Sequence, residues 1–165
     1  MTGRRRRRLG VCVMWAGLLA LTAADVAVAD PIGPWSGRSG PFSWEAHRVG
    51  CGVVDRSPST IRAHTRWKSS PANGYVRLIF VRQVQDGESD EWATVQRQRR
   101  STKNTGLQGA RGVIHWTQWF FPFAGEAGLK SRQTVVFAWF RDRPGADRLE
   151  LRREHRFRPC VVRGR

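Results

Sequence analysis

Apolar and polar residues alternate with a period of two in several stretches of this 165-residue chain. In residues 60–68 (TIRAHTRWK), every second side chain would face the same way, which sets apart Arg62, His64, Arg66 and Lys68. Residues 148–158 (RLELRREHRFR) alternate similarly. Because successive side chains of a strand point to opposite faces, the pattern predicts half-buried β-strands. No convincing helical period appears after residue 29, so we predict an all-β protein.

Further strand-like segments are separated by turn signals such as Asn73-Gly74 and Pro144-Gly145. We expect about seven strands, at 43–49, 60–68, 75–85, 91–99, 113–121, 133–141 and 148–158. Polar loops are expected at 100–112 and 123–132. Short strands with regular turns predict an antiparallel β-sandwich, and the strand number suits an immunoglobulin-like topology.

The N-terminus has the order of a secretory signal peptide. Five arginines, Arg4–Arg8, precede the apolar run 9–24, and small residues end the segment at Ala27-Val28-Ala29. The apolar run is short for a membrane span and Asp25 follows it, so we expect cleavage rather than retention in the membrane. Sec and twin-arginine export both stay open.

Cleavage divides the chain into a signal peptide (1–29), a glycine- and proline-rich arm (30–43) and a single β-sandwich domain (44–165). The mature chain is expected to be secreted, with no transmembrane segment. Its two cysteines, Cys51 and Cys160, allow one intramolecular disulfide, which persists outside the cytoplasm. The alternative is two buried free thiols. A bridge over 109 residue steps stabilises by about 4–5 kcal/mol in the chain-entropy model.

The mature chain is strongly basic. The whole sequence has 29 Lys and Arg against 13 Asp and Glu. Removing Arg4–Arg8 and Asp25 leaves 24 basic and 12 acidic residues, a net charge of +12. Such a field concentrates polyanions at low salt, and guanidinium groups bind phosphate and carboxylate in bidentate fashion. GC-rich coding, which favours arginine codons, is an alternative source of the charge.

We hypothesise first that this is a secreted, non-catalytic domain that binds an anionic polymer or a cell-envelope surface. The expected binding residues belong to the outward face of one strand and to a strand end with its loop: Arg62, Arg66, Lys68, Arg97, Arg99, Arg100, Lys103 and Arg111. The alternative for the same residues is a solvated cationic face with no ligand. No cofactor is expected.

The stretch HWTQWFFPF, residues 115–123, holds two tryptophans and three phenylalanines. Both faces of the predicted strand 113–121 are largely apolar, and a sandwich core needs large side chains. We therefore assign most of these rings to the core. Trp116 and Phe120 share a face, four residues apart, and are the pair that would form an exposed aromatic platform.

A small secreted hydrolase acting on phosphodiesters is a second hypothesis, because such chemistry needs a general acid, a general base and arginine. Glu45 and His47 share a strand face and are the candidate catalytic pair; an ordinary surface ion pair is the simpler interpretation. No cluster has metal-ligand spacing, so no metal site is expected. A third hypothesis is a protein-binding or inhibitor domain that uses the loops 100–112 and 123–132.

Overall fold

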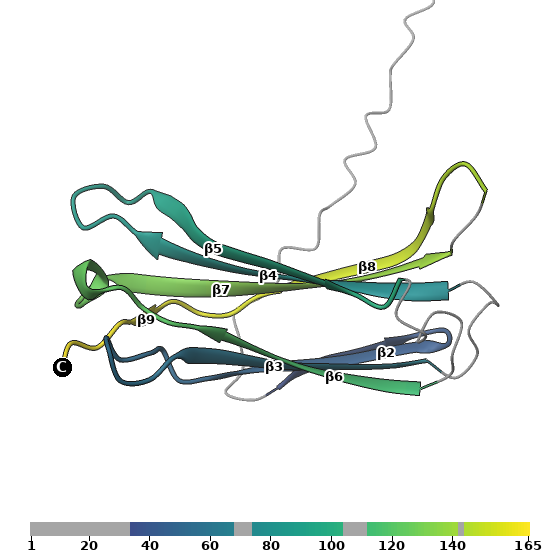
Figure 1. Cartoon of the computed structure of the whole chain (residues 1–165), viewed down its shortest axis with the longest axis horizontal. Coiled ribbons are helices and arrows are strands. Elements are labelled where there is room, and N and C mark those ends of the chain that lie inside the picture. The colour runs from purple at the N-terminus through teal and green to yellow at the C-terminus, as the bar shows by residue number, and fades with distance from the viewer. Residues whose placement is uncertain (1–33, 68–73, 104–111, 142–143) are drawn as a thin grey trace, which may run out of the picture.

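The computed structural model describes residues 34–67, 74–103, 112–141 and 144–165, and these form two antiparallel sheets packed face to face (Figure 1). The strands of the four-stranded sheet, in spatial order, are β1 (Trp35–Ser39), β2 (Phe42–Val49), β3 (Ser59–Trp67) and β6 (Gly112–Phe120). The five-stranded sheet contains β5 (Trp92–Ser101), β4 (Gly74–Gln85), β7 (Lys130–Arg141), β8 (Arg148–Arg156) and the short β9 (Cys160–Val161), which pairs with β7. The predicted all-β sandwich is confirmed.

The strand order can be compared with that of an immunoglobulin constant domain. If β2–β8 are taken as seven successive strands, the first, second and fifth share one sheet, and the third, sixth and seventh share the other, as in that fold. The fourth strand differs, because β5 pairs with β4 rather than with β6. The disulfide also lies elsewhere than the usual bridge between the second and sixth strands.

The residues expected to form an arm include a strand that pairs with the sheet. The 30–43 segment was expected to be an arm outside the β-sandwich domain, but β1 pairs with β2 over residues 35–39. Gly37 lies opposite Trp44, and a Cβ atom at Gly37 would lie 2.4 Å from Cζ2 of the indole. The glycine therefore permits close approach of β1 to a buried ring, rather than marking a loop.

The core lies between the inner faces of the two sheets and is rich in aromatic residues. Trp44 and Trp67 from one sheet, and Phe80, Phe137 and Trp139 from the other, are buried there. Alternation accounts for this, since the odd residues of β3 from Ser59 to Trp67 are all buried. Most tryptophans of the described strands thus fill the core.

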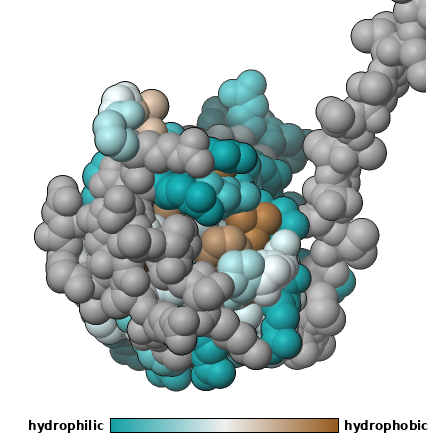
Figure 2. All heavy atoms as spheres, turned by 90° about the vertical axis from the view of Figure 1, so that its right-hand side faces the viewer, coloured by the Kyte–Doolittle hydropathy of each residue, from teal (hydrophilic) through white to brown (hydrophobic). Residues whose placement is uncertain are grey.

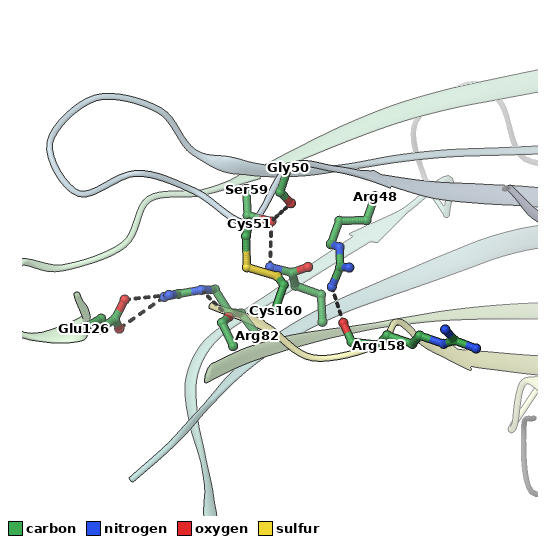
Figure 3. The surroundings of a disulfide bond; sticks show 10 residues. Arg48, Gly50, Cys51, Ser59, Arg82, Glu126, Arg158 and Cys160 are labelled. Atoms are coloured by element: carbon green, nitrogen blue, oxygen red, sulfur yellow. Dashed lines mark hydrogen bonds and ion pairs between the residues drawn. A yellow bond between two sulfur atoms is a disulfide. The ribbon is translucent and has the colours of Figure 1, made fainter. Parts of the chain in front are cut away.

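Three kinds of bond join the sheets at one end of the sandwich (Figure 3). The predicted disulfide forms between Cys51, in the β2–β3 connection, and Cys160 of β9, with 5.9 Å between the Cα atoms. Gln133 of β7 donates through Nε2 to Ser59 Oγ at 2.6 Å, and Ser59 in turn donates to the Gly50 carbonyl. The Arg48 guanidinium donates to the carbonyl of Arg158.

A buried ion pair lies at the same end (Figure 3). Arg82 of β4 is fully buried and binds both carboxylate oxygens of Glu126, in the 3₁₀ helix η1 (Ala124–Glu126), at 3.1 and 2.6 Å. Its Nε donates to Ser131 Oγ, and Glu126 also accepts the backbone N–H of Phe123. This bidentate geometry compensates the loss of hydration of both charges.

The opposite end is closed by rings. Phe42, Trp67, Tyr75, Trp139 and Phe140 line a hollow of about 10 Å³, room for about one water molecule. Figure 2 looks onto this end and shows a small group of apolar residues next to hydrophilic ones. The hollow is too small for an organic ligand.

The remaining sequence predictions can be compared with the residues that the structure describes. The signal peptide 1–29, Lys68, Arg111 and most of the 100–112 loop lie outside them. The expected 123–132 loop is wrong in part, since η1 lies within it and β7 begins at Lys130. Within the described ranges, no helix has the length and apolar character needed to cross a membrane.

Candidate anion-binding faces

Six arginines from four strands lie on the outer side of the five-stranded sheet. Directly opposed residues of antiparallel strands share a side, so the pairing register fixes this arrangement. One row of directly opposed residues runs across the sheet through Arg97, Val81, Thr134 and Arg156. Another row runs from Arg77 through Ala138 to Arg152. We call the set the arginine face; its members are Arg77, Arg97, Arg99, Arg132, Arg152 and Arg156.

Few acidic residues oppose this charge. β4, β5 and β7 contain no Asp or Glu, and β8 has two. Glu154 pairs with Arg152, and Glu150 with Arg141 and Arg148. Within the described part of the chain, Arg97, Arg99 and Arg156 have no ion-pair partner and are exposed. Their guanidinium groups are therefore open to a ligand.

Aromatic rings and polar side chains position two further arginines of this face. Arg132 lies 4.1 Å from the Trp92 ring centroid and donates to Gln83 Oε1 at 2.8 Å. Burial, and then the charge of Arg156, lower the pKa of the Arg132 guanidinium. Arg77 lies 4.6 Å from the Phe140 ring, which stacks on Tyr75. These contacts orient the cations without cancelling their charge.

The centre of the arginine face is apolar. Ile79 and Val81 of β4 lie there beside Val136 and Ala138 of β7, and the latter two are each 5 % exposed. The long arginine stems rise from positions around this strip. Arginine commonly covers apolar surface with its methylene groups and keeps its head in water.

The outer side of the four-stranded sheet carries charge through different residue types. We call it the histidine face; its members are Arg38, Glu45, His47, Arg62, His64, Arg66 and His115. Glu45 is the one acidic residue among β1, β2, β3 and β6.

One cross-strand row of the histidine face joins three titratable groups. Glu45, His64 and His115 are direct partners on β2, β3 and β6. His64 Nε2 lies 3.6 Å from Glu45 Oε2, and the two imidazole centroids are 5.3 Å apart. His47 shares a side with Glu45, as predicted, but it pairs across to Arg62. The closest histidine partner of Glu45 is thus on the next strand.

The predicted polyanion-binding residues do not converge. Arg62 and Arg66 lie on the histidine face, whereas Arg97 and Arg99 lie on the opposite side of the sandwich. Arg100 is exposed but pairs with the inward-facing Leu78, so it points away from the arginine face. Lys103 forms an ion pair with Asp147 at 2.8 Å. The two predicted basic elements therefore lie on different surfaces of the sandwich.

The predicted aromatic platform is wrong, because the pair faces inward. Phe120 is 1 % exposed in the core, and Trp116 is partly buried against it. The exposed aromatic residues are their neighbours Trp119, Phe121 and Phe123. The choice of face was inverted, since apolar residues occupy both sides of this strand.

Sequence reasoning missed Arg77, Arg132, Arg152 and Arg156 as members of a binding face. Residues 75–85 read as apolar on both sides, and the outer face of 148–158 alternates in sign. Spacing could have placed Arg152 and Arg156 together, but only the register joins them to β4, β5 and β7. His115 was also missed, and it is exposed on the outer side of β6.

Fold and surface together define a basic, disulfide-linked β-sandwich with two charged outer faces. No protein family matches the chain, and neither the curated proteins nor the solved structures contain a significant match. Among the described residues, no group of three or more His, Cys, Asp or Glu side chains is placed to hold a metal ion.

Proposed function

We propose that this protein is a secreted, non-catalytic β-domain that binds an anionic polymer through the arginine face. The observation that carries the proposal is the gathering of six arginines from four strands on one outer surface. Multiple guanidinium groups release counterions from a polyanion, which supplies affinity without sequence specificity.

The layout of the face favours a polymer over a small anion. Arg97 and Arg99 are two residues apart on β5, which places them about 6.7 Å apart along the strand. Arg156 lies three strands away in the same row as Arg97, which is about 14 Å across the sheet. A ligand with charges repeated along a chain can contact these groups together.

Salt dependence tests the proposal. We would measure retention on immobilised heparin and binding of single-stranded nucleic acid between 0.05 and 0.5 M salt. Replacing Arg97, Arg99 and Arg156 by Ser should lower the slope of log affinity against log salt by about 2–3, and affinity at 0.1 M by on the order of 10²-fold.

The matched control removes three arginines from the histidine face. Arg38→Ser, Arg62→Ser and Arg66→Ser cause the same change in net charge on exposed strand positions. We expect a smaller loss. Equal losses from the two triple variants would mean that net charge alone governs retention, and the arginine face would then have no special role.

A hydrolase remains the second candidate, favoured by the Glu45–His64–His115 row. Two adjacent imidazoles can act as general base and general acid on a phosphodiester, and Arg62 and Arg66 flank the row on β3. The test is turnover of RNA and DNA between pH 4 and 9. His64→Ala and His115→Ala should each abolish it, with a smaller effect of His47→Ala; no turnover by the wild type would remove this candidate.

A further inference from the structure

Three exposed aromatic residues follow one another at alternate positions where β6 ends. Trp119, Phe121 and Phe123 are 55 %, 62 % and 58 % exposed, and we call them the aromatic ridge. Phe120 and Pro122 between them are buried. Alternation in an extended chain puts the three rings on one side over about 13 Å. Val49, 44 % exposed, lies in the same cross-strand row as Trp119.

Three contacts hold the backbone beneath the ridge. Phe120 pairs with Ser59 on β3, and the Phe121 carbonyl accepts a hydrogen bond from Gln96 Nε2 on β5 at 3.1 Å. The Phe123 N–H donates to Glu126, whose carboxylate is held by the buried Arg82. The rings are thus presented by a rigid support, which reduces the entropy lost when they bind.

The chemistry of the ridge favours an apolar occupant next to anions. Phe121 and Phe123 have no hydrogen-bonding group, so two of the three exposed rings offer a ligand only apolar surface. Arg62 lies on the same outer face, two residues from the row of Trp119. β3 and β6 contain no acidic residue.

We propose that the aromatic ridge inserts into the interfacial region of an anionic lipid bilayer, with the basic surface of the four-stranded sheet toward the headgroups. Phenylalanine and tryptophan partition into this region, and arginine is attracted to acidic lipids. Membrane insertion goes beyond polyanion binding and uses a different surface, on the other sheet from the arginine face.

Vesicle co-sedimentation tests the ridge, using the exported chain from Asp30, which contains every described residue. With vesicles of phosphatidylcholine and phosphatidylglycerol, Phe121→Ser with Phe123→Ser should lower partitioning at least tenfold. Leu149→Ser, an exposed apolar residue at 48 % in the other sheet, is the matched control for Phe121→Ser and should change partitioning less than twofold.

Two readouts separate insertion from other binding. Brominated acyl chains should quench part of the tryptophan fluorescence, and Trp119→Phe should remove that quenched part. Unchanged quenching in Trp119→Phe, or equal partitioning of the double serine variant and wild type, would overturn the proposal. Self-association lost in the double variant without vesicle binding would also overturn it, in favour of a protein partner. Heparin retention should be unaffected by ridge variants, so the two proposals can fail separately.

Discussion

The two outer faces of this sandwich carry charge of the same sign through different side chains. The arginine face combines β4, β5, β7 and β8 around an apolar strip, and all six of its charged members are guanidinium groups. The histidine face mixes three histidines and three arginines with Glu45, whose carboxylate lies 3.6 Å from His64 Nε2. Net charge alone, the quantity visible in composition, therefore does not describe how charge is distributed over the surface of this protein.

The largest expected effect concerns the link between the two sheets. Replacing Cys51 and Cys160 by Ser should lower the free energy of unfolding by about 4–5 kcal/mol, because the bridge restricts a loop of 109 residues in the unfolded chain. Denaturant unfolding, with tryptophan fluorescence for the core, measures this. A loss below about 1 kcal/mol would show that the hydrogen bonds between the sheets hold them together without the disulfide.

Removing the charge partner of a buried arginine should lower the free energy of unfolding more than removing an arginine on the surface. Glu126→Ala leaves the buried guanidinium of Arg82 without its carboxylate, which should cost about 3–5 kcal/mol of unfolding free energy. Arg97→Ser, at an exposed position, should cost less than about 0.5 kcal/mol. Similar losses in thermal or denaturant unfolding would contradict the distinction between structural and ligand-binding arginines.

The smallest expected effect concerns the pKa of Tyr75, which lies at the end of the arginine face. Burial, and then the hydrogen bond that its hydroxyl donates to Asp147 at 2.7 Å, raise the pKa of Tyr75 above 10.0. Because the folded state favours the protonated phenol, this stability is present below pH 10 and is lost as the pH rises through the folded value. Tyr75 is the only tyrosine, so absorbance of tyrosinate near 295 nm reads it directly. Asp147→Asn should lower the midpoint; a wild-type midpoint at or below 10 would contradict the structure.

Particular strands show how far sequence reasoning reaches. In β3, the alternation assigned each described side chain to the correct side. In β6, apolar residues occupy both sides, and the platform was sought on Trp116 and Phe120 while their neighbours are exposed. In β1, residues assigned to a glycine- and proline-rich arm pair with β2, and Gly37 accommodates the ring of Trp44. Period-two patterns decide facing only where one side is polar.

The sequence by itself predicted the strand-rich class, the pairing of Cys51 with Cys160 and the assignment of most tryptophans to the core, because these depend on local alternation and on the two cysteines that follow the predicted signal peptide. Only the tertiary structure decided which arginines share a surface. Cross-strand register brings residues 97 and 156 into one row and places residues 62 and 97 on opposite sides. Register depends on long-range packing of two sheets, and no local pattern encodes it.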